Sequence, residues 1–329
     1  MLARIAHELY WLGRNVARAE HTARMLEGIY QADLQGRPDD PVGVTLSWGA
    51  LLAIMGAGTE VMANGEGPGI RERALATLTL DTGNQLSVVS CVGRAREGAR
   101  TVRDVISAEM WEAINTFHLG FAERDTVALH SGPYSMSSYV KARCALFWGV
   151  AGRTMLRDEA YAFLEAGGRF ESADMVLRML RVALPPGHVV DGETSPIRDG
   201  QALALLQAVG GLQAYRRAVA APPNAIPVAR FLLFTRTYPD SVAASVDAVC
   251  QSLSAADSNP RASEPVLRLS RLSADLEFRG GGGGNDSELL EVCDIVGREL
   301  SLTDRDVTER YFGGAPAGET FYTNDAQRR

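Results

Sequence analysis

The sequence predicts an all-α fold in which two similar helical halves pack as one large helical bundle. Helical periodicity dominates the 329 residues, and no alternating pattern typical of strands competes with it. A second observation is an internal similarity at a constant spacing, which predicts the two halves. The third is an apolar face that recurs at steps of three and four from Ile5 to Tyr30, as in one long helix. Tyr10 and Trp11 lie on the back of this helix, so we expect it to be covered on more than one side.

Helix-breaking residues and apolar periodicity predict the other helices and loops along the chain. The runs QGRPDDP at 35–41 and NGEGPG at 64–69 are typical of a loop and a turn, and 186–200 of a further loop. We expect helices at 46–62, 71–80, 86–117 with a bend near Gly93, 137–164, 173–184, 201–220, 228–234, 241–255 and 287–300. Five consecutive glycines at 280–284 are typical of a flexible linker.

Two parts of the sequence are alike at an offset of 154, the difference between Gly167 and Gly13. The same offset relates Arg24-Met25-Leu26 to Arg178-Met179-Leu180 and continues through two more elements, although Ala and Leu are common enough for chance matches. A duplication predicts a first helical half at 1–150, a second at 151–312 that contains the glycine-rich linker, and a loose tail at 313–329. Two such halves would pack around a pseudo-two-fold axis with the equivalent long helices at the centre.

Composition excludes several classes of function. Lys and Arg number 33 and Asp and Glu 40, so the net charge is −7, and an acidic chain without a basic block is a poor nucleic-acid binder. Lys141 is the single lysine, which reflects either codon bias or arginines fixed as forks for carboxylate or phosphate. Four scattered cysteines suit neither a disulfide framework nor a zinc site. With no secretory leader and no apolar stretch of about 18 residues, the sequence predicts a cytoplasmic protein without a membrane partner.

Standard catalytic motifs are missing from the sequence. It contains no G-x-G-x-x-G, no Walker loop and no H-E-x-x-H, and the glycine run lacks the Lys-Ser/Thr of a phosphate loop. His7 and His21 share one side of the first helix, but about 21 Å of helix separates them, so they cannot chelate one metal. We therefore expect no metal and no cofactor of its own.

Charged residues at helical spacing are the remaining candidates for a site. One helix side carries three arginines and an aromatic residue, namely Arg96, Arg100, Arg103 and Trp111. Three guanidinium groups repel one another unless an anion lies between them. Three alternatives follow for these arginines. They pair with Glu20 and Asp174 in a structural ion-pair network, they bind the carboxylate or phosphate of a ligand, or they form a solvated face.

A second stripe contains Glu171, Asp174 and Arg178. Pairing of Asp174 with Arg178 within the helix explains it structurally, while acid–base chemistry or a hard cation are the functional alternatives. The neighbouring arginines argue against a cation. Asp81 and Asn84 occupy a helix stop, where such residues act as caps or contact a ligand.

Several ordered runs resemble the bacterial alpha-E family, an all-helical domain with a Glu-Arg motif. They include Leu9-Tyr10-Trp11-Leu12-Gly13-Arg14, an arginine-rich segment from Ala95 to Asn115, Ala214-Tyr215-Arg216-Arg217 and Tyr238-Pro239. The family core reads Gly-Arg-x-x-Glu-Arg-Ala, and this chain departs from it in both halves. The first copy keeps Arg18 but has Ala17 in place of Glu, while the second keeps Glu171 but has Ser172 in place of Arg, with Gly168 at the position of Arg14.

The resemblance implies a context and not a reaction. Family members resemble partners of circularly permuted ATP-grasp proteins, which form amide bonds through acyl phosphates. The first hypothesis is therefore a noncatalytic accessory subunit that binds the ligase, an anionic amino-acid or peptide substrate, or both, with ATP and Mg²⁺ only on the ligase. The alternatives are an enzyme for an amino-acid, peptide or acyl-phosphate substrate, and a scaffold or homo-oligomer with apolar patches around Tyr10 and Trp11.

Together these arguments give one set of candidate residues for substrate or anion binding. They are Arg14, Arg18, Glu20, Arg24, Asp81, Asn84, Arg96, Glu97, Arg100, Arg103, Trp111, Glu171, Asp174 and Arg178.

Overall fold

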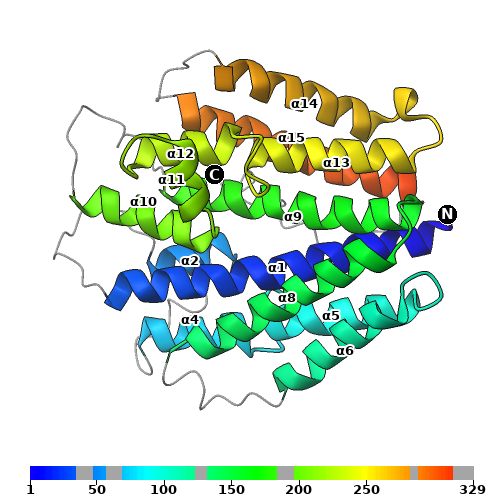
Figure 1. Ribbon diagram of the computed structural model, residues 1–329, viewed down its shortest axis with the longest axis horizontal. Helices are drawn as coiled ribbons and strands as arrows, with labels where there is room; N and C mark the ends of the chain where they lie inside the picture. Colours follow the sequence, from blue (N-terminus) through cyan, green and yellow to red (C-terminus); the bar gives the residue numbers. More distant parts are fainter. Residues whose placement is uncertain (35–46, 57–68, 123–131, 184–195, 282–287, 314–329) are drawn as a thin grey trace, which may run out of the picture.

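A computed structural model describes residues 1–34, 47–56, 69–122, 132–183, 196–281 and 288–313. Within these ranges the chain is helical and contains no strand, which confirms the predicted all-α bundle (Figure 1). The predicted linker lies partly, and the predicted tail almost wholly, outside the described residues.

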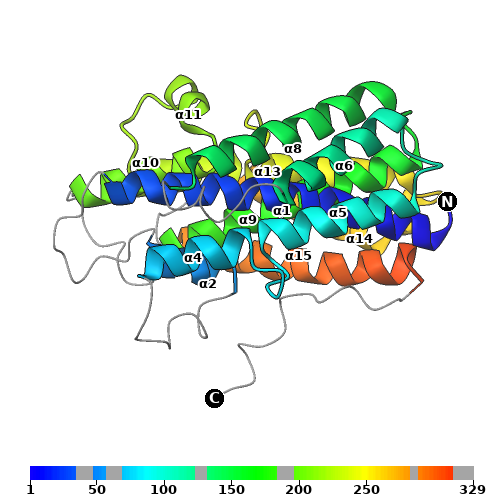
Figure 2. The same cartoon turned by 90° about the horizontal axis from the view of Figure 1, so that it is seen from below.

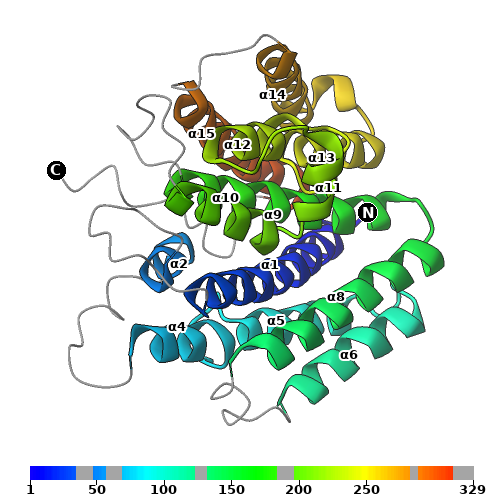
Figure 3. The same ribbon diagram turned by 60° about the vertical axis from the view of Figure 1, so that its left-hand side comes forward.

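Two long helices, α1 (Ala3–Leu34) and α9 (Glu159–Ala183), lie side by side at the centre of the molecule (Figure 3). They approach closely at two glycines: a Cβ at Gly13 would overlap the carbonyl oxygen of Leu164, and a Cβ at Gly167 would overlap that of Tyr10. Tyr10 is 1% exposed, so α1 is covered on its back as expected. The scaffold alternative predicts an apolar surface patch around Tyr10 and Trp11, and the burial of Tyr10 contradicts it at that residue.

On one side of this pair, α5 (Val88–Thr101) packs against α1, and α6 (Ala108–Ala122) and α8 (Tyr134–Thr154) complete the layer (Figure 3). The single helix predicted at 86–117 is wrong, because the chain leaves the helix at Val102 and not at Gly93. The Ser107 hydroxyl then accepts a hydrogen bond from the amide of Met110 and begins α6.

The predicted helix at 137–164 is likewise two helices. It breaks after Thr154, and the Asp158 carboxylate accepts hydrogen bonds from the amides of Ala160 and Tyr161 and caps α9. α9 then runs through the separately predicted segment 173–184 as one element. The predicted boundary between the halves, at residue 150, falls inside α8.

On the other side, α13 (Val242–Ala256) packs against α9, followed by the short 3₁₀ helix η1 (Pro260–Ala262), α14 (Glu264–Gly281) and α15 (Leu289–Tyr311). α14 is absent from the sequence prediction, although Leu269, Leu272 and Leu276 are buried at helical spacing. Two of the linker glycines, Gly280 and Gly281, belong to this helix.

Shorter helices lie around one end of the central pair (Figure 1), and Figure 2 shows α2, α4 and α10 at that end from below. They are α2 (Trp48–Ile54), α4 (Ile70–Thr79), α10 (Pro196–Ala208), α11 (Leu212–Ala218) and α12 (Ala225–Phe234). The helix predicted at 201–220 is interrupted at Gly210, whose φ of 71° suits glycine, and Gly211.

Several features recur at positions 154 apart. Ser87 and Ser241 both accept a hydrogen bond from an amide three residues on, and the helices that they cap begin at the next residue. Gly56 and Gly210 have φ values of 69° and 71°. The duplication stays a prediction, and these matched local structures favour it.

Candidate functional site

A cluster of buried charges joins α1, α9 and α15, and we call it the buried arginine network. Its members are Arg14 and Arg18 from α1, Glu171 from α9, and Tyr10 and Asp304, which close it from α1 and α15. Glu171 Oε2 lies 2.9 Å from Arg14 Nε and 2.7 Å from Arg18 Nη2. Asp304 Oδ1 accepts hydrogen bonds from Arg14 Nη1 at 2.7 Å and from the Tyr10 hydroxyl at 3.0 Å.

The charges of this network balance, since two guanidinium groups face two carboxylates. Burial raises the pKa of Glu171, but the charges of Arg18 and Arg14 outweigh that effect and hold the pKa well below its usual range. Burial, and then Asp304, raise the pKa of Tyr10, so its hydroxyl stays a donor. The network is therefore charged, internally neutralised and closed to solvent, which suits a structural role.

The lowered pKa of Glu171 predicts a defined acid response. A carboxylate with a depressed pKa in the folded state contributes stability above its unfolded pKa, about 4.3 for Glu, and loses it as the pH falls below that value. We expect the difference in unfolding free energy between wild type and Glu171→Gln to stay constant between about pH 7 and 5 and to narrow toward about pH 3. Urea unfolding at these three pH values measures it. If the difference in unfolding free energy between the two proteins widens as the pH falls, the lowered pKa of Glu171 is contradicted.

Two further ion pairs flank the network, each within one helix. Arg24 Nη2 lies 2.7 Å from Glu20 Oε1 in α1, and Arg178 Nε lies 3.0 Å from Asp174 Oδ2 in α9. The two pairs occupy positions 154 apart. Arg178 also donates to the carbonyl oxygen of Ile54, at the end of α2. Of the alternatives for the stripe that contains Glu171, Asp174 and Arg178, the structure therefore shows pairing of Asp174 with Arg178 within the helix.

The arginine stripe of α5 lies at the surface and not in the interior. Arg96 Nη1 and Arg100 Nε both bind Glu97, at 2.7 and 2.8 Å, so the expected pairing with Glu20 and Asp174 is wrong. The side chain of Arg100 is 63% exposed. Glu97 is close to both arginines on the same helix, whereas Glu20 and Asp174 bind arginines of their own helices.

Trp111 of α6 is part of the same surface. The guanidinium carbons of Arg103 and Arg96 lie 4.7 and 5.6 Å from the centre of its ring, which is cation–π distance. Arg96 Nε also donates to Asn115 Oδ1 at 2.8 Å. We call the four side chains of Arg96, Arg100, Arg103 and Trp111 the arginine–tryptophan surface.

The remaining candidates, Asp81 and Asn84, shape the turn between α4 and α5. Asp81 Oδ1 accepts from the amide of Gly83, and Asn84 accepts from the amide of Leu86 while donating to the carbonyl oxygen of Thr77. Both residues therefore act as turn and cap residues in this structure.

Tyr10 and Asp304 are the members of the network that are absent from the predicted set of site residues, and Asp304 is the charged one. It lies beyond residue 300, where the last predicted helix ended, and its partner Arg14 is 290 positions away. The continued periodicity of α15 to Tyr311 was the available signal.

Among the described helices, none has both the length and the apolar character needed to cross a membrane. In the same ranges, no group of three or more His, Cys, Asp or Glu side chains is arranged to hold a metal ion.

The fold and the buried network define an all-helical domain whose two central helices are joined by arginine–glutamate pairs. Residues 1–312 match the Alpha-E family, described as "a predicted alpha-helical domain with a conserved ER motif", and the chain belongs to that family. Relatives from Mycobacterium bovis and Mycobacterium tuberculosis, named as uncharacterised proteins, are 24% identical over 304 residues. The match covers 86% of this chain but 30% of each relative, so the chain spans less than a third of their length. No solved structure matches it.

The offset of 154 gives the altered Glu-Arg motif a simple interpretation. It maps the surviving pair of Arg18 and Glu171 onto positions 172 and 17, which hold Ser172 and Ala17. If the predicted duplication holds, Ala17 and Ser172 occupy the positions equivalent to this pair. Ser172 Oγ lies 3.1 Å from His21 Nε2, in a hydrogen bond between α9 and α1.

Proposed function

We propose that this chain is a noncatalytic helical subunit that binds a circularly permuted ATP-grasp amide ligase and helps it to hold an anionic amino-acid or peptide substrate. The observation that carries the proposal is the division of its arginines. Arg14 and Arg18 are neutralised in the interior, whereas Arg100 and Arg103 of the arginine–tryptophan surface are exposed and Arg96 and Trp111 are half-buried. Arginines at the surface can contact a partner, whereas the two in the interior cannot.

The chemistry of the exposed surface suits a protein partner. Trp and Arg are the residue types most enriched among those that dominate binding energy at interfaces. The cation–π contacts hold Trp111 and Arg103 in place before binding, which lowers the entropy lost on association. A carboxylate-bearing partner segment or substrate can bind the guanidinium edge that Arg103 presents.

The length of the mycobacterial relatives supports the same view. Their match to this chain leaves about 70% of each polypeptide outside it, by subtraction of the 30% that is covered. In those proteins the helical domain is covalently joined to further sequence, as expected of a domain that works together with others.

Complex formation tests the proposal. Purified chain and a co-encoded ATP-grasp protein should elute together from size exclusion at micromolar concentration, with ATP and Mg²⁺ bound by the ligase alone. Arg103→Glu should weaken the complex by about tenfold or more, as expected of one charge-assisted contact reversed in sign. Arg305→Glu, which alters an arginine 62% exposed on α15, is the matched control and should leave affinity unchanged.

Two outcomes would count against the proposal. Separate elution of the two proteins would remove the complex altogether. Turnover of an amino-acid or peptide substrate by the purified chain alone, abolished by Arg100→Ala at unchanged melting temperature, would favour the enzyme hypothesis instead.

A further inference from the structure

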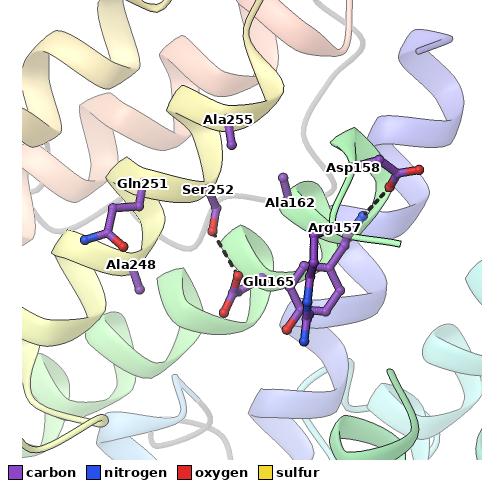
Figure 4. Close-up of a pocket in the computed structure, with 9 residues that line it drawn as sticks. Arg157, Asp158, Ala162, Glu165, Ala248, Gln251, Ser252 and Ala255 are labelled. Carbon is purple, nitrogen blue, oxygen red and sulfur yellow. Dashed lines mark hydrogen bonds between the residues drawn. The ribbon is translucent and has the colours of Figure 1, made fainter. Parts of the chain in front are cut away.

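A small pocket lies between the first turns of α9 and the last turns of α13, apart from the buried arginine network and the arginine–tryptophan surface (Figure 4). Its volume is about 210 Å³. Three alanines, Ala162, Ala248 and Ala255, line it and leave the space open between the helices. A pocket of this size is smaller than those that hold drug-sized ligands, so it fits a molecule of amino-acid size.

Three charged side chains line this space, and one of them, Asp158, caps α9 by accepting hydrogen bonds from the amides of Ala160 and Tyr161. The other two, Arg157 and Glu165, carry opposite charges and do not bind each other. Glu165 Oε2 accepts only a 3.3 Å hydrogen bond from Ser252, and no cation of the described chain pairs with this carboxylate (Figure 4). Arg157 stacks on the Tyr161 ring at 3.7 Å and donates one Nη2 hydrogen bond to the carbonyl oxygen of Gly152. In the described ranges no carboxylate forms an ion pair with Arg157, so its other N–H groups remain donors for a ligand.

We infer that this pocket binds a free α-amino acid, with its ammonium group at Glu165, its carboxylate at Arg157 and an aliphatic side chain against the alanines. A zwitterion of this size matches both charges at once, and a simple anion or cation matches one. The Gln251 amide at the rim of the pocket adds a neutral donor and acceptor.

This inference rests on the proposed function and extends it. An amide ligase of the ATP-grasp class joins an acyl phosphate to an amine, which displaces phosphate and forms the amide. An accessory subunit that holds a free amino acid would supply the amine reactant. The pocket therefore indicates a free amino acid as the substrate class. The buried arginine network gives no such indication, because it is closed to solvent.

Titration of the full chain with L-leucine, followed by ¹H–¹⁵N NMR, tests the pocket. With about nine non-hydrogen atoms, leucine should bind with a dissociation constant on the order of 1 mM and shift resonances of residues 157–165. N-acetyl-L-leucine lacks the ammonium and L-leucinamide lacks the carboxylate, so each should bind about tenfold more weakly or worse. Glu165→Gln and Arg157→Gln should weaken leucine binding by a similar factor.

Controls keep this result separate from the ligase complex. Glu309→Gln alters a carboxylate on α15 that is 67% exposed and should bind leucine like the wild type. Glu165→Gln should still elute with the ligase, because the pocket is distinct from the arginine–tryptophan surface. Absence of leucine binding, or equal binding by Glu165→Gln, overturns the pocket assignment and leaves the complex untouched. Loss of the complex with leucine binding intact overturns only the proposed function.

Discussion

Glu171→Gln lowers the free energy of unfolding by about 3–5 kcal/mol at neutral pH, the range measured when one partner of a buried ion pair is removed. The side chain keeps its size, so packing contributes little to this loss. The cost arises because Arg14 and Arg18, each 4% exposed, lose the carboxylate that both of them bind. Asp304 already accepts hydrogen bonds from Arg14 and from the Tyr10 hydroxyl, so it does not take the place of Glu171 between the two arginines.

Urea unfolding followed by far-UV circular dichroism measures this loss. Glu277→Gln is the matched control, because its carboxylate is 73% exposed and pairs with Arg236 at 3.4 Å. Exposed pairs contribute about 0–1 kcal/mol, so the control should unfold close to the wild type. Equal losses for the two variants would show that the buried arginine network is not what holds the central helices together.

Gly167→Ala should destabilise the protein by about 3 kcal/mol or more, at the upper end of the cost of overpacking. In most helices the same exchange stabilises by about 0.5–1 kcal/mol, because glycine has the lower helix propensity. The sign reverses here because the added Cβ would overlap the carbonyl oxygen of Tyr10, a backbone atom that cannot rotate away. The two central helices must then separate, which also stretches the contacts of Glu171.

Gly149 in α8 supplies the control for this exchange. A Cβ at that position meets no atom within 4 Å, so Gly149→Ala should stabilise the protein by the ordinary helix-propensity amount. Thermal unfolding of both variants gives the comparison. Stabilisation by Gly167→Ala would mean that α1 and α9 are farther apart than the structure places them.

The sequence predicted the fold class and the long first helix because apolar periodicity reports directly on which helix face is buried. The breaks at Val102 and Met155 were not predicted because neither residue is Gly or Pro. The next helices begin there at the caps Ser107 and Asp158. The helix α14 was missed although its leucines keep helical spacing. The glycines at the end of α14 are typical of a linker, and two of them belong to the helix.

The candidate site was only partly predictable for a related reason. Arg18 and Glu171 were chosen from spacing and from the family resemblance, and both lie in the buried arginine network. Periodicity within one helix gives no information on which residues of different helices meet. The partner Asp304 was therefore missed, and the α5 arginines were assigned carboxylates that bind elsewhere.

The buried arginine network also has a consequence for synthesis of the protein on the ribosome. Arg14 emerges early, but its partners Glu171 and Asp304 follow 157 and 290 residues later. At about 5–20 residues per second, the second partner appears roughly 15–60 s after the arginine. Until Glu171 is made, Arg14 and Arg18 lack the carboxylate that both of them bind, and the network is complete only when α15 supplies Asp304. The first half of the chain therefore contains the cations of its future interior without the carboxylates that neutralise them.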